Sequence, residues 1–173
     1  AQCLVGSEMC IRDRADGDFK AQVQVEPVYN YTVAIDTTPD TTATWSPLCA
    51  GIENFSESLN EQVQQFFFMC GKGFANNYVT GMAPSLTITG RRVKGDAAQE
   101  YIFGAKYALM KKRETQLQIS QLDATGANTQ TITCNVTIQN IVEINGNATD
   151  PSQISFDLAF NGTPTLKSTP VGG

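Results

Sequence analysis

The stretch Ile132-Thr-Cys-Asn-Val-Thr-Ile138 alternates apolar and polar side chains at every position. Successive side chains of a β-strand point to opposite faces, so the apolar side chains share one face and the threonine and asparagine side chains share the other. This pattern predicts a half-buried antiparallel strand. The same alternation predicts further strands over Ile154–Phe160, Leu86–Thr89 and Leu117–Ser120, and an opening strand over Ala21–Glu26.

Turn-forming residues separate these runs. Asp123–Gly126 is expected to close a hairpin between two of the strands. Asn145–Asn147 and Asn161–Gly162 are expected to be turns as well, and Thr37–Thr42 is expected to be a polar loop. The tail from about 163 to 173 contains two prolines and ends in two glycines, which predicts a flexible or partner-docked end.

One segment has helical instead of strand periodicity. Between Asp96 and Leu109 the apolar residues 98, 101, 102, 105 and 109 form one stripe of an amphipathic helix. Asp96 is the predicted N-cap, because its carboxylate can accept a hydrogen bond from a free N–H group of the first turn. Gly104 weakens the helix, so a bend or an end there is compatible with the pattern. The predicted fold class is therefore mainly β: an antiparallel β-sandwich or partly closed barrel with one flanking α-helix at about 96–109.

The first 14 residues show neither kind of periodicity, although they contain two of the five cysteines. The basic residues Arg12 and Arg14 follow the short apolar patch, which reverses the order found in a signal peptide. The string from Cys3 to Arg14 resembles the translation of a sequencing adaptor. We therefore expect residues 1–14 to be a non-native artefact that packs against nothing, with the native start of the chain missing. Residues 15–173 are expected to form a single β domain.

The composition argues against several classes of function. The formal net charge of −5 disfavours specific nucleic-acid binding, because such binding gains affinity from neutralising phosphates. The chain has no histidine, which is the most frequent general base and transition-metal ligand. Cys49, Cys70 and Cys134 have no metal-binding spacing and are expected to be small buried residues in a reducing compartment. We expect no enzymatic activity, no cofactor, no metal and no membrane partner.

Two patterns that could suggest chemistry have simpler interpretations. Cys70–Phe74 places glycines on both sides of Lys72, but it lacks the spacing of a phosphate-binding loop and favours a turn between strands. Asp96 and Glu100 could act as an acid and a base, but stabilisation of a helix N-terminus explains them better. No catalytic set of residues remains.

The candidate functional residues are instead aromatic and basic. Phe66, Phe67 and Phe68 are adjacent, so in a strand they cannot all share one face. Either the predicted helix or a neighbouring subunit could cover the second face, and the sequence favours neither. The basic run Arg91-Arg92-Val93-Lys94 follows a predicted strand. We expect it to be either a solvated loop or a contact with an acidic neighbouring subunit. The candidate subunit-interface residues are Phe66, Phe67, Phe68, Arg91, Arg92 and Lys94.

From Trp45 onward a series of features occurs in a characteristic order. These are Trp45–Asn54, Asn60–Gln65, Thr80–Gly81, Ser85–Gly90, Lys94–Tyr101, Lys111–Arg113, and Ala148–Phe160 followed by Asn161–Gly162. This order resembles that of phage major tail tube proteins of the long, non-contractile-tail type. The similarity spans most of the chain and rests on spacing rather than on one diagnostic motif.

The resemblance implies a structural subunit and not an enzyme. Six copies would form a ring whose inward strands close into a barrel, and the rings would stack into a tube through which DNA leaves the capsid. Tape-measure, tail-terminator and tail-tip proteins would be partners, and DNA would pass through the lumen without specific binding. The protein would be assembled in the bacterial cytoplasm and reside in the virion tail. The alternative is a secreted or virion β-sandwich binding module of the carbohydrate-binding or adhesin kind.

Overall fold

The computed structural model describes residues 25–123 and 125–168. The expectation for residues 1–14, the first part of the predicted strand 21–26 and the end of the predicted tail lie outside this range. The elements in chain order are η1 (Val28–Asn30), β1 (Tyr31–Asp36), β2 (Trp45–Pro47), β3 (Ile52–Ser58), β4 (Gln62–Phe67), η2 (Met69–Gly71), β5 (Ala75–Gly81), β6 (Ser85–Arg91), α2 (Ala97–Gly104), η3 (Met110–Arg113), β7 (Glu114–Leu122), β8 (Asn128–Val142) and β9 (Gln153–Ser168).

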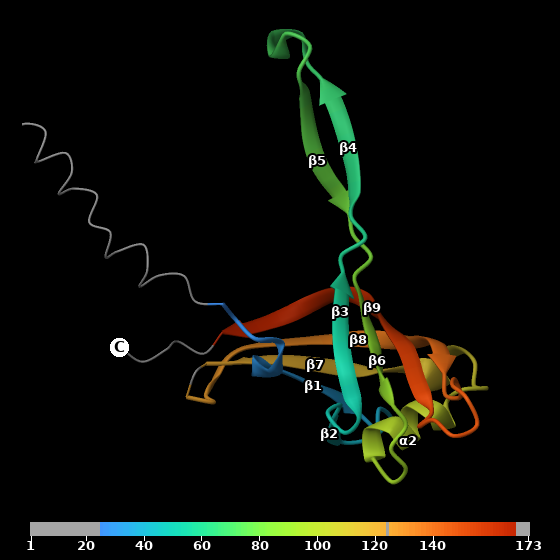
Figure 1. Ribbon diagram of the computed structural model, residues 1–173. Coiled ribbons are helices and arrows are strands. Elements are labelled where there is room, and N and C mark those ends of the chain that lie inside the picture. Colours follow the sequence, from blue (N-terminus) through green and yellow to red (C-terminus); the bar gives the residue numbers. More distant parts are fainter. Residues whose placement is uncertain (1–24, 124, 169–173) are drawn as a thin grey trace, which may run out of the picture.

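Seven strands form one antiparallel sheet in the order β2-β1-β7-β8-β9-β6-β3. The sheet curls on itself, and the remaining two strands, β4 and β5, form a ribbon that projects from it (Figure 1). For the described residues, the prediction of a mainly β fold with one α-helix is confirmed. Of the two architectures predicted, the structure has the partly closed barrel, because no second sheet faces the first within the described ranges.

The core lies on the apolar face of the curled sheet, under α2. The stretch 132–138 belongs to β8, where Val136 and Ile138 are fully buried as the alternation predicts. Helix α2 covers this face, and the ring of Phe103 meets the ring of Phe156 edge-on at 6.3 Å between centroids. The same cluster includes Val33, Ile35, Leu86, Ile88, Ile102, Leu117, Ile154 and Leu158. The apolar stripe of one helix and the period-two pattern of the strands therefore meet in one layer.

Helix α2 is shorter than the sequence predicted. Asp96 is its N-cap, and its Oδ2 accepts a hydrogen bond from the Gln99 N–H at 3.0 Å. The helix ends at Gly104 and not at Leu109, whose side chain is 78% exposed. A glycine in a helix costs about 1 kcal/mol relative to alanine, and of the two later residues of the predicted stripe Ala105 is buried but Leu109 is not. The chain turns there and enters η3.

Two glycines allow β3 to lie against β6. A Cβ atom added to Gly90 would lie 2.2 Å from the carbonyl oxygen of Gly51, which is closer than atoms approach in real proteins. Gly51 also has a φ of +69°, a conformation that other residues rarely adopt. The close approach lets the Arg91 N–H donate to the Gly51 carbonyl at 2.6 Å. Glycine at these positions therefore sets where β3 begins.

The turns and ends differ from the prediction at several points. Asp123–Gly126 does connect β7 with β8. Asn161–Gly162, however, lies inside β9, where Gly162 has a φ of +82° next to a shift in the β8–β9 register. Strand β9 continues to Ser168, so the first part of the expected flexible tail is paired in the sheet. Val25 and Glu26 precede η1 and do not form the opening strand.

Candidate assembly surfaces

The β4–β5 hairpin projects from the body of the protein, away from α2 (Figure 1). All six residues of β4 are exposed. The residues Cys70–Phe74 form the turn at its tip, as predicted, with Lys72 in a left-handed conformation. Helix α2 does not cover Phe66–Phe68, so the expectation that the helix buries their second face is wrong. The other expectation, that a neighbouring subunit covers it, stays a prediction.

A short neck joins the hairpin to the sheet. Asn60, which has a φ of +47°, donates from Nδ2 to the Ala83 carbonyl at 2.9 Å and accepts from the Ser58 hydroxyl at 2.9 Å. The Ala83 N–H donates to the Leu59 carbonyl at 3.1 Å. One asparagine therefore ties both strands together where the hairpin leaves the sheet.

One face of the hairpin is aromatic. Phe66 and Phe68 stack with their ring centroids 6.3 Å apart, and Tyr78 from β5 meets Phe66 edge-on at 5.8 Å. Both arrangements are favourable geometries for aromatic pairs. All three side chains are 43–50% exposed. We call Phe66, Phe68 and Tyr78 the aromatic face.

The opposite face of the hairpin has apolar pairs on both sides of the polar pair Gln65–Asn77. Val63 pairs across the ribbon with Val79, and Phe67 pairs with Ala75. Val63, Val79 and Phe67 are between 51% and 67% exposed. We call Val63, Phe67, Ala75 and Val79 the second face. The two faces carry no formal charge, and Lys72 at the tip is the only charged residue between positions 62 and 81.

The basic run 91–94 contacts acidic groups of its own chain. Arg91 Nε lies 3.0 Å from Glu53, and Arg92 lies 3.0 Å from Glu100 and 3.3 Å from Glu143. Arg92 is only 12% exposed and stacks over the Phe103 ring at 4.6 Å. The Gly95 N–H and the Arg92 guanidinium, which both donate to Glu100, lower the pKa of that carboxyl. Arg91 and Arg92 thus have intrachain partners.

Lys94, the last residue of that run, is exposed. It forms no ion pair with any residue in the described part of the chain. Of the three basic candidates it is the one whose cation is open to a neighbour.

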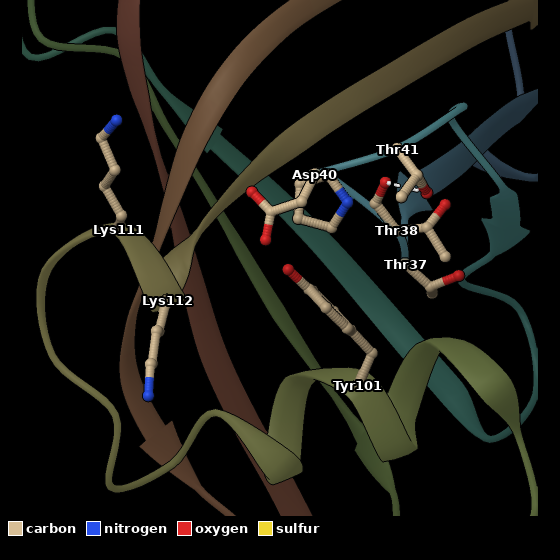
Figure 2. A pocket seen from close by; sticks show the side chains of 8 residues that line it. Thr37, Thr38, Asp40, Thr41, Tyr101, Lys111 and Lys112 are labelled. Carbon is tan, nitrogen blue, oxygen red and sulfur yellow. Dashed lines mark hydrogen bonds between the residues drawn. The ribbon is translucent and has the colours of Figure 1, made fainter.

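A shallow hollow of about 420 Å³ lies between the loop 37–41 and the start of η3. Figure 2 shows Tyr101 rising from α2 toward Asp40, while Lys111 and Lys112 point away from one another. Burial raises the pKa of Tyr101. Because the charged groups diverge, the hollow does not bring an acid, a base and a nucleophile to one point. Within the described residues there is also no cluster of three potential metal ligands.

The face of the sheet opposite the core is polar and has few charges. Gln116 lies beside Asn135, and Gln118 lies beside Thr133, which in turn pairs with Thr165 of β9. Asp157 accepts hydrogen bonds from Thr87 at 2.6 Å and from Asn140 at 2.6 Å. The other residues that the register places on this face of β7 and β8 are Glu114, Ser120, Thr131, Thr137 and Gln139.

Both edges of the sheet are open in the single chain. Strand β3 pairs with β6 on one side and has no strand on its other side within the described residues. At the opposite edge, β2 is three residues long and pairs with only half of β1. An open edge presents unpaired N–H and C=O groups that can pair with another chain. None of the described helices is both long and apolar enough to cross a membrane.

Comparison with known proteins finds relatives by structure only. No protein-family profile matches the chain, and no curated protein matches it. A chain in the tail of a gene transfer agent particle, resolved with C6 symmetry, superimposes with a TM-score of 0.62 at 12% identity, over 83% of this chain and all of that one. A chain of the sheath–tube complex of an extracellular contractile injection system gives 0.57 at 13% identity, over 88% of this chain and 98% of that one. The tube-terminating cap of the anti-feeding prophage gives 0.56 at 15% identity, over 88% and 99%.

The chain has a tail-tube-like fold. Its similar structures are parts of tails, tubes and caps, from particles that include a contractile system. Because the sequence identities are low, this likeness establishes the fold alone.

Sequence reasoning found part of the candidate surface. It singled out Phe66–Phe68 and expected them to split between two faces, as the hairpin does. It missed Tyr78 and the Val63–Val79 pair. The signal that could have found them is that segments rich in β-branched and aromatic residues flank the 70–74 turn on both sides, which is typical of a hairpin. It also expected three buried cysteines, but only Cys134 is buried, and Cys49 and Cys70 are exposed.

Proposed function

We propose that this chain is a structural subunit of a phage tail tube of the long, non-contractile type. Copies of it assemble into hexameric rings, and the rings stack into the conduit through which DNA is ejected. The observation that carries the proposal is the combination of two open sheet edges with an exposed hairpin on a tail-tube-like fold, where both faces of the hairpin carry apolar side chains and no formal charge. The chain has no enzymatic role in this proposal.

The open edges supply the means of closing a ring. An edge that pairs with a different edge of the next copy is a heterologous contact, which closes into a ring when the rotation allows. The free side of β3 offers seven residues for such pairing, and the short β2 leaves part of β1 available. A second heterologous contact along the ring axis extends rings into a filament.

The polar face of the sheet suits the wall of a DNA conduit. Its threonine, glutamine and asparagine side chains are wetted by water, and its few charges avoid strong binding. DNA is held by proteins that neutralise its phosphates with lysine and arginine. A chain of net charge −5 weakly repels phosphate instead, which lets DNA pass.

Tape-measure, tail-terminator and tail-tip proteins are the proposed partners of the tube. One of the similar structures is a cap that terminates a tube, and another is part of a sheath–tube complex. The same fold therefore occurs in a tube protein and in a protein that closes the end of a tube. The protein would be assembled in the bacterial cytoplasm and become part of the virion tail.

A binding module is the second candidate, because the hairpin does present clustered aromatic side chains. Sugar-binding surfaces use exposed aromatic rings together with polar groups that fix orientation. The aromatic face has Gln64 and Asn76 beside its three rings. A glycan array with the purified chain tests this candidate, and binding that is lost on Tyr78→Ala would favour it over the tube.

Electron microscopy of the purified full chain at increasing concentration tests the proposed function. We expect rings and stacked tubes to appear. A variant in which residues 62–81 are replaced by two glycines keeps both sheet edges, so it should form rings that do not stack. A wild-type chain that stays monomeric at high concentration, also after addition of tail-tip extract, would contradict the proposal.

A further inference from the structure

We propose that Asn145 is a site of spontaneous covalent modification, where the side-chain amide is replaced by a carboxylate while the chain stays folded. Water is the only co-reactant. The sequence contains two Asn-Gly pairs, Asn145–Gly146 and Asn161–Gly162, and the fold exposes the first and protects the second. The modification belongs to the single folded chain and does not depend on the proposed tube.

The reaction is an intramolecular attack followed by hydrolysis. The main-chain nitrogen of Gly146 attacks the side-chain carbonyl carbon of Asn145, and a new C–N bond closes a cyclic imide. The bond to Nδ2 breaks, and the proton from the Gly146 nitrogen leaves with the amide group as ammonia. Water then opens the imide at either carbonyl carbon, which gives aspartate or isoaspartate. Glycine favours the attack because it has no Cβ atom to obstruct the approach.

The connection between β8 and β9 leaves these atoms accessible. Asn145 and Gly146 are both exposed. In the described part of the chain, neither the side-chain amide of Asn145 nor the Gly146 N–H forms a hydrogen bond. A Cβ atom added to Gly146 would have no neighbour closer than 3.7 Å, so the space around the attacking nitrogen is open. The only bonds of Asn145 are those of its main chain, to Ser152 and Gln153.

Asn161 has the same following residue but a different environment. It lies inside β9, where it pairs with Asn135 of β8, and its Nδ2 donates to the Thr137 hydroxyl at 2.7 Å. The attack requires the main chain to rotate between asparagine and glycine. In a paired strand this rotation breaks hydrogen bonds of the ladder, so the reaction must wait for local opening of the sheet.

Loss of the amide also changes the charge of the chain. The formal net charge of −5 becomes one unit more negative for each modified Asn145. The new carboxylate lies at a hollow of about 340 Å³ that Glu53 also lines, so it adds negative charge next to an acidic side chain. Modified and unmodified chains should therefore separate by ion-exchange chromatography.

Reaction rates in the folded and the unfolded chain test the inference. The full chain is incubated at mildly alkaline pH, which favours the deprotonated nitrogen, once in buffer and once in urea. Tandem mass spectrometry of proteolytic peptides then locates the modified asparagines. In the folded chain Asn145 should react within about threefold of its rate in urea, while Asn161 should react at least about tenfold more slowly than its rate in urea.

Two substitutions serve as matched controls in the ion-exchange measurement. The folded wild type should accumulate one more acidic species. Asn145→Gln should not, because glutamine must close a larger ring, and Asn161→Gln should accumulate it at the wild-type rate. Slowing of Asn145 by tenfold in the folded chain would overturn the inference, as would an Asn161 that reacts as fast as in urea. An acidic species that persists in Asn145→Gln would overturn it too.

Discussion

At the scale of single residues, Gln99 holds the helix to the sheet. Its side chain is fully buried and donates from Nε2 to the Ala50 carbonyl at 2.7 Å and to the Arg91 carbonyl at 3.2 Å. Its Oε1 accepts from the Val93 N–H at 2.9 Å. The sequence placed Gln99 in the first helical turn but did not show these partners. Ala50 lies 49 residues away in the chain, and Arg91 and Val93 reach the side chain only because of how the loop before the helix folds.

Replacement of Gln99 by leucine should destabilise the monomer. Gln99→Leu leaves two carbonyl oxygens and one N–H group buried without partners, so the free energy of unfolding should fall by about 2–4 kcal/mol. Gln116→Leu is the control, because that side chain is exposed on the polar face, and its effect should stay within about 0.5 kcal/mol. Urea unfolding measures both, and equal effects of the two variants would argue against the bonds described for Gln99.

Cys134 gives the core a dependence on alkaline pH. Burial raises the pKa of its thiol from 9.0 to about 11. The folded chain therefore keeps the thiol protonated while the unfolded chain ionises it, so this contribution to stability is complete below pH 9.0 and is lost as pH rises toward about 11.

The comparison of wild type with Cys134→Ala isolates this contribution from those of other groups that titrate at high pH. Unfolding by urea at the two ends of that pH window should show a steeper loss of stability for wild type than for the variant. Parallel losses in the two proteins would show that the thiol does not ionise differently in the folded and unfolded states.

At the scale of elements, the neck decides how firmly the hairpin is held. Asn60 combines a positive φ, which asparagine tolerates, with hydrogen bonds to both sides of the neck. Asn60→Gly keeps the backbone conformation and removes these bonds together with the one from Nδ2 to the Ser85 hydroxyl. Amide hydrogen exchange in β4 and β5 should then become faster, while exchange in β7–β9 stays as in wild type. Unchanged exchange in the hairpin would mean that the neck is held by its backbone alone.

The strands of the sheet were predictable, and the hairpin was not. Period-two alternation marks β6, β7, β8 and β9 because one face of each is buried within the chain itself. The hairpin carries apolar and polar side chains on both faces and has no buried side, so its strands lack this pattern. The helix was placed correctly at Asp96 but extended too far, since periodicity continues to Leu109 where no sheet remains to cover it.

At the scale of the whole molecule, the single chain leaves exposed several surfaces that contacts with other copies would bury or pair. It has two open sheet edges, an exposed hairpin with apolar side chains on both faces, and a polar sheet face of few charges. Composition alone could argue against catalysis and nucleic-acid binding, but the arrangement of these surfaces depends on strand order and on where the hairpin leaves the sheet. Neither can be read from residue types, because both are set by contacts between distant segments.

The most direct measurement is a reconstruction of the assembled particle viewed along its axis. We predict six copies per ring, with the free side of β3 paired to a strand of the next copy and with Gln118 and Thr133 facing the central channel. A particle in which the edges of every copy stay unpaired, or in which that polar face points outward, would contradict it.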